Sequence, residues 1–364
     1  MKGKQTISNQ QIKNLLVTTV VGVGILSLPS EMATILENDG WIPLIIGGLL
    51  FIPILIMIDR LYKMYPNRTI VEIGIEVYGK IVFSVFMIII LAYLVMLEAY
   101  TLRVFGEVVK SYLLEVTPIE VIILTLSLAV SYLARSELTV VARTANMIYP
   151  ILLGLIIFII VISIPNSEPT NMLPVFQSDF KNISKGIVAS LVSFAGYEII
   201  FVAYPYSEDT DNRLKYVMRG LLIVTVIYVI VFVICLSLFG IDQLKREIWP
   251  TMALANEVDL GGYFVENLEG IVLALWSFVV YSTLGPILFF AGRTLSMIFN
   301  TKSHDLFIFL LIPIVYVIAI LPENVIVVYN QFGEILNYLT LVSIVIMPIV
   351  FVIGAWIKKR RSKA

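Results

Sequence analysis

Apolar residues dominate this chain in runs of about 20, and each run is separated from the next by a short polar stretch. A run of that length crosses the hydrocarbon core of a bilayer as an α-helix. The pattern predicts ten spans: Ile12–Ile35, Trp41–Leu61, Ile81–Val109, Ile119–Leu133, Val140–Ile164, Ile183–Tyr204, Leu221–Phe239, Ile271–Ile298, Leu306–Leu321 and Ile335–Ile357. Because the connections are short, we expect a single integral membrane domain over residues 1–364.

The first predicted span contains a break at Gly22-Val23-Gly24-Ile25-Leu26-Ser27-Leu28-Pro29. Each glycine weakens a helix interior by about 1 kcal/mol, and the proline removes a backbone donor. Inside a membrane, freed backbone groups are tolerated where they line a cavity, and the amides that begin a half-helix attract an anion. The break is therefore a candidate binding site. The alternative is that the glycines let a neighbouring helix approach closely.

A second break lies in the sixth predicted span, at Ser193-Phe194-Ala195-Gly196-Tyr197-Glu198, and Pro205 closes that segment. It follows the first break by five spans, and an odd number of spans inverts the topology. Interrupted helices at matching positions of two inverted halves indicate a binding site near the membrane midplane. We therefore predict an all-α fold with a five-plus-five inverted repeat, its halves covering about residues 12–164 and 183–357.

Basic residues are distributed unequally between the two predicted faces. The N-terminus, the even-numbered loops and the C-terminus carry 19 of the 25 lysines and arginines, and the odd-numbered loops carry five. Lysine and arginine favour the cytoplasmic side of a membrane. The asymmetry predicts that both termini are cytoplasmic, which requires an even number of spans and agrees with ten.

Composition excludes several classes of function. Hydrophobic residues make up 59% of the chain and charged residues 14%, against about a quarter in soluble proteins. With a single cysteine, Cys235, and a single histidine, His304, a zinc site or a Cys/His catalytic pair is not expected. The net charge of −1 gives no support for nucleic-acid binding. We expect no enzyme activity, no metal and no cofactor.

Two connecting segments have a recognisable character. Residues Arg68–Gly79 contain apolar positions at Ile70, Val71, Ile73, Ile75 and Val77 and fit an amphipathic helix along the inner membrane surface. The alternative is an ordinary helix within a loop. The longest outer segment, Gly240–Gly270, contains Ile248-Trp249-Pro250-Thr251 and several acidic residues. It is long enough to form a docking surface for a partner, and we predict that Trp249 contributes to it.

The two interrupted helices resemble those of the amino acid–polyamine–organocation permease superfamily, whose fold is similar to that of the leucine transporter. Four stretches, Gly22–Pro29, Lys110–Leu124, Ser193–Glu198 and Ile248–Thr251, look like those of GerAB-type spore permeases, the B subunits of nutrient germinant receptors. The resemblance covers nearly the whole chain. It implies an A subunit with soluble domains, a lipoprotein C subunit and a place in the spore inner membrane.

The resemblance also implies a ligand site at the two breaks. In the family fold, the free amides of Gly22, Val23, Gly24 and Ile25 face a ligand carboxylate, and the carbonyls around Ser193–Gly196 face its ammonium group. Phe194 and Ala195 then border the side-chain pocket. A zwitterionic amino acid bound in this way needs no charged side chain from the protein, which suits the high cost of charge inside a membrane.

The third span and Glu198 supply further candidates. Tyr93 and Leu97 lie four residues apart on one helix face, which lines the cavity in the family fold. The alternative for Tyr93 is ordinary packing. Glu198 is an ionisable residue near the midplane and is a candidate site residue for that reason. The alternative for Glu198 is a carboxyl group that ties the sixth span to a neighbour.

The eighth span carries Ser282 and Thr283, whose hydroxyls complete a sodium site in sodium-coupled proteins of this fold. The alternative is that both hydroxyls bond their own helix backbone. Some proton-coupled permeases carry a basic residue in the middle of the fifth span, and here Arg143 lies at its cytoplasmic end instead. That departure disfavours ordinary ion-coupled transport.

These observations lead to one hypothesis with two alternatives. The chain is a membrane subunit that binds a small-molecule germinant, with an amino acid as the expected class, and signals through the receptor A and C subunits. The first alternative is an amino acid transporter that works by alternating access. The second is a structural subunit, embedded in lipid, whose cavity binds nothing.

Overall fold

The computed structural model describes residues 6–257 and 268–361, and within these ranges the fold is built from helices without strands. The α-helices are α1 Asn9–Val20, α2 Gly24–Leu36, α3 Trp41–Met64, α4 Ile70–Tyr78, α5 Lys80–Tyr112, α6 Ile119–Ala134, α7 Leu138–Ser163, α8 Phe180–Val192, α9 Ile200–Ala203, α10 Arg213–Leu244, α11 Pro250–Glu257, α12 Leu268–Ile298, α13 Asp305–Ile320, α14 Val325–Val327, α15 Gly333–Thr340 and α16 Met347–Arg361.

Short 3₁₀ and π segments connect or interrupt these helices. The 3₁₀ segments are η1 Glu37–Asp39, η2 Ile164–Asn166, η3 Pro169–Met172, η4 Tyr197–Ile199 and η5 Tyr204–Tyr206, and the π segments are η6 Val328–Phe332 and η7 Leu341–Ile346.

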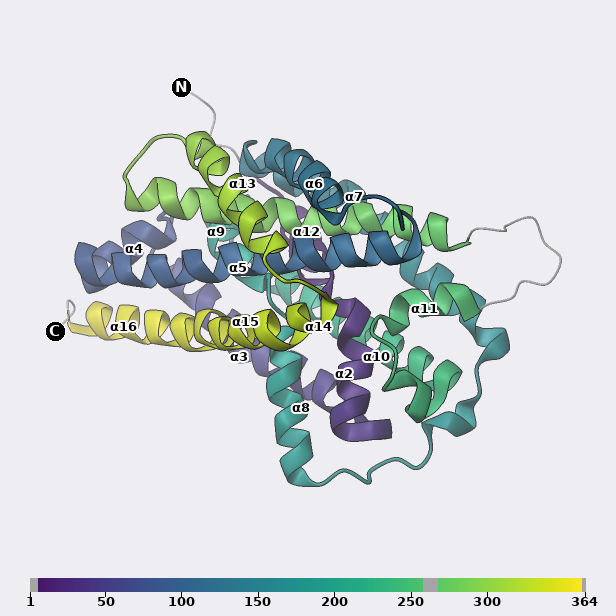
Figure 1. The fold of residues 1–364 in the computed structure, drawn as a ribbon. Helices are drawn as coiled ribbons and strands as arrows, with labels where there is room; N and C mark the ends of the chain where they lie inside the picture. Colours follow the sequence, from purple (N-terminus) through teal and green to yellow (C-terminus); the bar gives the residue numbers. More distant parts are fainter. Residues whose placement is uncertain (1–5, 258–267, 362–364) are drawn as a thin grey trace.

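Both predicted breaks are present. Helices α1 and α2 form one span bent by 58°, and α8 forms another with the segment Tyr197–Tyr206, bent by 46°. Both α2 and α8 turn away from the long helices α5, α12 and α16 (Figure 1). Six further helices are long and apolar enough to cross a membrane. The predicted fourth and ninth spans correspond to the shorter apolar helices α6 and α13.

The tenth span begins earlier than predicted. It runs without a sharp bend from Val325 to Arg361, whereas the hydropathy pattern placed its start at Ile335. The first ten residues include Tyr329, Asn330 and Gln331, which lower the local hydropathy although their backbone is helical. Two stretches of this span, η6 and η7, are π-helical, a form that proteins often use at functional sites.

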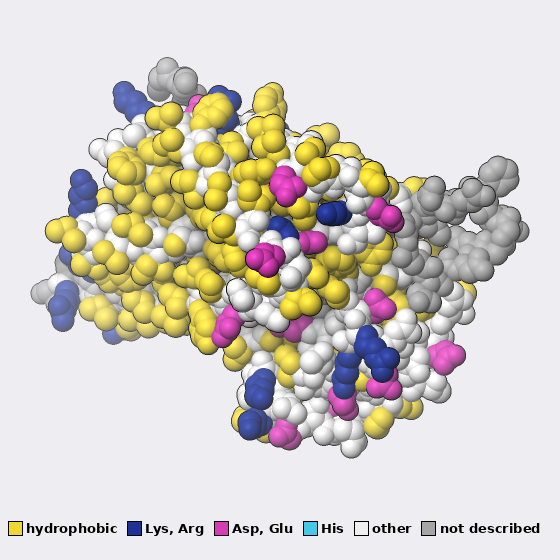
Figure 2. Space-filling view, viewed as in Figure 1, with side chains coloured by type: hydrophobic (Ala, Val, Ile, Leu, Met, Phe, Trp, Pro, Cys, Tyr) yellow, Lys and Arg dark blue, Asp and Glu magenta, His cyan; other side chains and the backbone are white. Residues whose placement is uncertain are grey.

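The surface agrees with a protein that lies in lipid. Hydrophobic side chains cover most of the face formed by α5, α13 and α16, and basic residues gather where α16 ends (Figure 2). The segment after Arg68 folds as the predicted helix α4, which begins with a capping box between Thr69 and Glu72 and packs against α5 and α16. The several helices that are long and apolar enough to cross a membrane make the chain a multi-pass membrane protein.

Candidate functional site

A cavity of about 560 Å³ lies between the two helix breaks. The ends of α1 and α8, together with α2, form one side of it, and α5, α12 and the first turns of the tenth span form the other. Residues Lys245–Ile248 of the outer segment lie at its mouth. The cavity is therefore lined by both predicted half-helix ends, which come from positions about 170 residues apart in the chain.

The first break leaves backbone amides free at the cavity. The amide of Gly22 donates to the Val20 carbonyl, but those of Val23, Gly24 and Ile25 donate to no backbone carbonyl among the described residues. They begin α2, whose dipole favours an anion at this end. A Cβ atom at Gly24 would have no heavy atom within 4 Å, so this residue borders open space.

The second break is held by a left-handed glycine and a tyrosine. Gly196 has a φ of 101°, and a Cβ atom there would lie 2.8 Å from the carbonyl oxygen of Thr19 in α1. The Tyr228 hydroxyl lies 2.6 Å from the carbonyl oxygen of Ser193 and 3.1 Å from that of Val20. This single side chain of α10 therefore joins the two breaks.

The carbonyl groups of the second break are largely satisfied within the protein. Ser193 accepts from Tyr228, Phe194 accepts from the amide of Tyr197, and Gly196 accepts from the amide of Ile199. The Ala195 carbonyl accepts no hydrogen bond from a described residue. Of the four carbonyls expected to face a ligand ammonium group, that of Ala195 is thus the one without a donor.

The predicted site residues divide into two groups. Those that line the cavity are Val23, Gly24, Leu97, Ser193, Ala195 and Thr283. Those that lie elsewhere are Gly22, Ile25, Tyr93, Phe194, Gly196, Glu198 and Ser282, and they are buried in contacts that hold the breaks in place.

Gly22 and Gly24 have different surroundings. A Cβ atom at Gly22 would lie 2.5 Å from the Thr283 hydroxyl oxygen, so Gly22 lets α12 approach the break closely. The Gly22 carbonyl oxygen also lies 3.5 Å from the indole nitrogen of Trp276 in α12. Close helix packing therefore accounts for Gly22 but not for Gly24. Ile25, one residue further on, is buried, and its carbonyl accepts from Thr251 of α11.

Tyr93 and Glu198 bind each other behind the cavity wall. The Tyr93 hydroxyl donates to one oxygen of the Glu198 carboxyl group at 3.0 Å, and the Gly196 amide donates to the other at 2.9 Å. Both side chains are buried. The carboxyl group thus ties the second break to α5. Phe194 is also buried, with its ring packed against Phe51 and Tyr228.

The hydroxyls of the eighth span bond to backbone carbonyls. Ser282 donates to Val279 at 2.8 Å within its own helix, whereas Thr283 donates to Thr18 of α1 at 2.8 Å. Thr283 thereby fastens the interrupted helix to α12. Within residues 6–257 and 268–361, no group of three or more His, Cys, Asp and Glu side chains is placed to hold a metal ion.

A comparison with protein families shows to which family the chain belongs. The sequence profile described as "Spore germination protein" matches residues 6–327. The chain belongs to this family. It is 26% identical to Spore germination protein YndE of Bacillus subtilis (strain 168) over 98% of both chains, and 25% identical to Spore germination protein GerLB of Bacillus cereus over 99% of this chain and 97% of that protein.

Solved structures establish the fold of the chain. It matches an outward-open, substrate-bound Na⁺-coupled sialic acid symporter with a TM-score of 0.67 at 12% identity, over 94% of this chain and 80% of the symporter. It matches MhsT in complex with L-phenylalanine with a TM-score of 0.65 at 12% identity, over 97% and 99% of the two chains. The fold is the leucine-transporter-like inverted repeat that the two breaks predicted.

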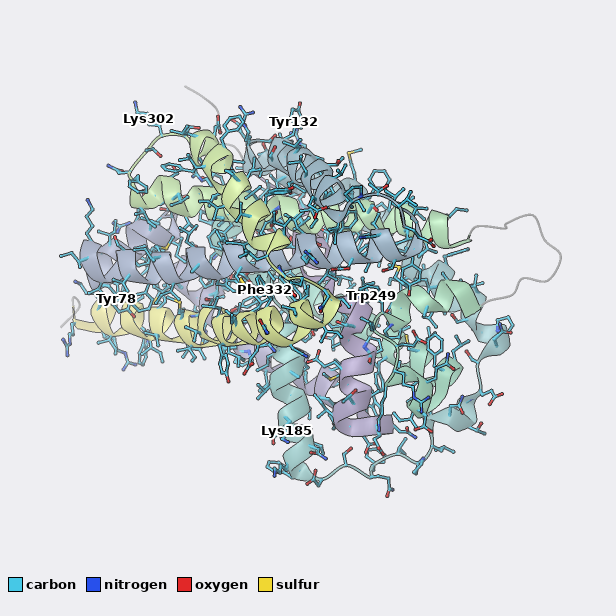
Figure 3. The ribbon with its side chains drawn as sticks, in the orientation of Figure 1. Tyr78, Tyr132, Lys185, Trp249, Lys302 and Phe332 are labelled. Atoms are coloured by element: carbon cyan, nitrogen blue, oxygen red, sulfur yellow. The ribbon has the colours of Figure 1, made fainter. Side chains whose placement is uncertain are left out.

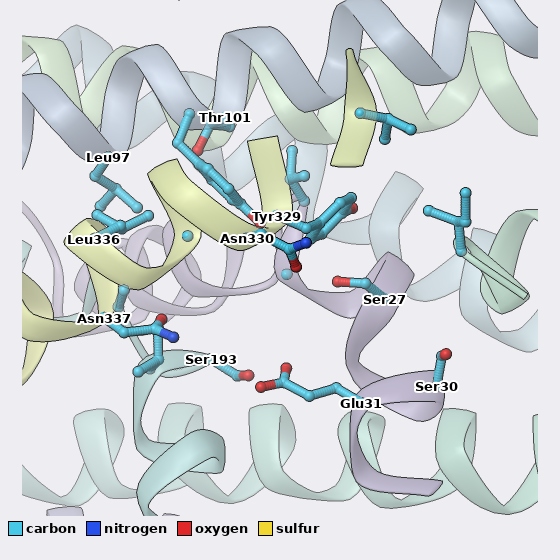
Figure 4. A pocket seen from close by; sticks show the side chains of 18 of the residues that line it. Ser27, Ser30, Glu31, Leu97, Thr101, Ser193, Tyr329, Asn330, Leu336 and Asn337 are labelled. Atoms are coloured by element: carbon cyan, nitrogen blue, oxygen red, sulfur yellow. The ribbon is translucent and has the colours of Figure 1, made fainter. Parts of the chain in front are cut away.

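Several cavity residues lie outside the predicted site. Ser27, Ser30 and Glu31 come from α2, and Tyr329, Asn330 and Asn337 come from the start of the tenth span (Figure 4). A sequence signal existed for the second group, because three consecutive polar residues at Tyr329–Gln331 are unusual at the end of an apolar span. For α2, the signal was the spacing of Ser27, Ser30 and Glu31, which places them on one helix face.

The structure of the outer segment corrects one prediction. Trp249, expected to dock a partner, is only 6% exposed, and its indole nitrogen donates to the Tyr329 hydroxyl at 2.8 Å (Figure 3). Thr251 is also buried, and its hydroxyl donates to the Ile25 carbonyl at 2.8 Å. Both side chains are thus bonded within their own chain, Trp249 to a residue of the cavity wall and Thr251 to the first break. Ile248 remains exposed, and residues 258–267 of the predicted surface lie outside the described ranges.

Proposed function

We propose that this protein is the membrane subunit of a nutrient germinant receptor and that it binds an amino acid in the cavity between the two helix breaks. The observation that carries the proposal is the pairing of free amides at Val23 and Gly24 with a free carbonyl at Ala195 across one cavity. Amides at a helix N-terminus suit a carboxylate, and a carbonyl suits an ammonium group. The names of the relatives connect the family with spore germination.

Gly24→Ala is expected to raise the germinant concentration needed for half-maximal germination without changing the amount of protein in the membrane. The added methyl group enters the cavity where the backbone amides approach the ligand. Loss of one charge-assisted hydrogen bond costs about 1.5–3 kcal/mol, which weakens affinity by about 10- to 150-fold. The dose response of spores and the immunoblotted abundance of the protein are the two measurements.

Gly22→Ala serves as the matched control. Its methyl group would collide with Thr283 rather than enter the cavity, and overpacking of this kind typically costs about 1–3 kcal/mol. We expect lower abundance, with normal affinity in the protein that remains. Normal affinity in both Gly24→Ala and Ala195→Leu would place the ligand site elsewhere.

The second candidate function is amino acid transport by alternating access, which is favoured by structural neighbours that are transporters. A receptor and a transporter need the same cavity, so binding alone does not separate them. Purified protein in proteoliposomes should bind radiolabelled amino acid at equilibrium. Time-dependent accumulation inside the vesicles, abolished by an ionophore, would favour the transporter, and binding without accumulation would favour the receptor.

The unequal distribution of basic residues supports a membrane orientation with both termini in the cytoplasm, and the resemblance supports a location in the spore inner membrane. Cysteine placed at Thr210, between η5 and α10, should be labelled by an impermeant maleimide from the cytoplasmic side only. Cysteine at Asp242, near the outer end of α10, should be labelled from the opposite side only. Native Cys235 is buried, so the unaltered protein should react little and gives the background level of labelling. Labelling of both positions from one side would contradict the ten-span topology.

We further propose that the protein assembles with the receptor A and C subunits. Co-purification of the chain with both subunits from spore membranes would support it, and the search for the contact should exclude Trp249 because that side chain is buried in its own chain.

A further inference from the structure

Glu31 is an acidic residue that lines the cavity. It takes no part in the proposed binding of the ligand's carboxylate by the free amides or of its ammonium group by the Ala195 carbonyl. It lies on α2, one helical turn beyond Ser27, and its carboxylate extends toward Ser193 (Figure 4). No hydrogen bond or ion pair joins this carboxylate to another side chain within residues 6–257 and 268–361. Two other carboxylates are each paired at 2.8 Å, Glu37 with Lys245 and Glu107 with Arg103.

Two tyrosines flank the same part of the cavity. The rings of Tyr100 in α5 and Tyr329 in η6 lie 6.1 Å apart at an angle of 89°, and both residues line the cavity together with Glu31. Trp249 holds the Tyr329 hydroxyl at 2.8 Å. Aromatic faces attract ammonium and guanidinium groups, most strongly where water is partly excluded. A carboxylate beside two such rings is a chemical environment that favours a cation.

The position of Glu31 also determines how long a ligand side chain must be to reach it from Gly24. Seven residues separate it from Gly24 along α2, and a rise of 1.5 Å per residue places the two positions about 10 Å apart. A ligand that places its carboxylate at the Gly24 amide therefore reaches Glu31 with a group at the end of a side chain several carbons long. The four-carbon stem and terminal ammonium of lysine match both the length and the charge.

We propose that Glu31, together with the rings of Tyr100 and Tyr329, binds the side-chain cation of a basic amino acid. The proposal rests on the proposed function, because it takes the carboxylate of the ligand to lie at the first helix break. It adds the substrate class: an amino acid with a positive charge about four carbons from its α-carbon. Lys245 and Arg246, the basic residues at the mouth, belong to the outer segment, and Lys245 is already paired with Glu37.

Equilibrium binding to the full-length protein in proteoliposomes tests this inference with two radiolabelled ligands. L-lysine and L-norleucine have similar side chains, but norleucine lacks the terminal charge. Lysine should bind at least about 10-fold more tightly than norleucine. Glu31→Gln should weaken lysine binding by about 10- to 100-fold and leave norleucine binding unchanged. Glu31→Asp, which keeps the charge, should retain the preference for lysine.

Glu120→Gln is the control variant, since Glu120 is an exposed carboxylate in the first turn of α6 and does not line the cavity. It should change neither affinity. Equal binding of lysine and norleucine by the unaltered protein, or unchanged lysine binding by Glu31→Gln, would overturn the cation site while leaving amino acid binding in place. If the protein bound neither lysine nor norleucine nor any other neutral amino acid, the proposed function would be overturned, and the cation site with it.

Discussion

Asp59→Asn is expected to lower the free energy of unfolding by about 3–5 kcal/mol, because it leaves a buried arginine without its counter-ion. Arg213, at the start of α10, donates from its Nε atom to the Asp59 carboxylate at 2.8 Å, and these side chains are 3% and 1% exposed. Lys63 pairs with the other carboxylate oxygen at 2.9 Å. The guanidinium carbon also lies 4.7 Å from the centre of the Tyr204 ring.

Thermal unfolding of the detergent-solubilised protein, together with its abundance in membranes, measures this effect. Glu76→Gln is the matched control: it removes the ion pair between Arg68 and Glu76, whose side chains are 48% and 42% exposed. Exposed pairs contribute about 0–1 kcal/mol, so little change is expected. A second variant that removes both buried charges, Asp59→Asn with Arg213→Met, should recover part of the loss, because neither charge then lies unpaired. Equal stability of Asp59→Asn and Glu76→Gln would contradict a structural role for the buried pair.

Gly196→Ala should abolish the response to germinant and reduce the amount of folded protein. At a φ of 101° any other residue is strained by roughly 1–2 kcal/mol, and here the new methyl group would also lie 2.8 Å from the Thr19 carbonyl oxygen. That oxygen belongs to the backbone of a packed helix and cannot rotate away. The second break would have to shift, and with it the Gly196 amide that binds Glu198.

Gly154→Ala provides the comparison for Gly196→Ala. Gly154 lies within α7, where an added Cβ atom meets no heavy atom within 4 Å, and alanine favours a helix interior by up to about 1 kcal/mol. We expect unchanged or slightly higher stability and an unchanged germination response. A Gly196→Ala protein that is as abundant and as responsive as Gly154→Ala would show that the left-handed glycine is dispensable.

Hydropathy and helix-breaking residues were sufficient to predict the fold. The spans are long apolar runs, and the breaks combine glycine and proline in ways that a continuous helix disfavours, so both features are local in the sequence. Where an end was misplaced, as at Ile335, polar residues continue a helix that the apolar pattern cannot detect. The same holds for α10, which begins at Arg213 rather than Leu221.

The candidate site was less accessible to prediction because side-chain direction depends on the neighbouring helix. Gly22 and Gly24 are two residues apart and equivalent as helix breakers, yet Gly22 packs against Thr283 and Gly24 borders open space. Tyr93 and Leu97 share a helix face, but only Leu97 reaches the cavity, since Tyr93 turns to Glu198. The opposing wall at Tyr329 comes from the tenth span, whose polar residues are visible in the sequence but do not indicate which break they face.

The position of the Tyr228 hydroxyl between two carbonyl groups affects how the two breaks respond to a ligand. A phenol carries one hydrogen, but this one lies within reach of two carbonyl oxygens, those of Val20 and Ser193, at 3.1 and 2.6 Å. The two interrupted helices therefore compete for a single phenol proton, and when it goes to Ser193 the Val20 carbonyl keeps only the Gly22 amide as its donor. An ammonium group has three protons to donate. Bound at the Ala195 carbonyl, it could also donate to the neighbouring Ser193 carbonyl and leave the phenol proton to Val20, so that a ligand would change which break Tyr228 holds.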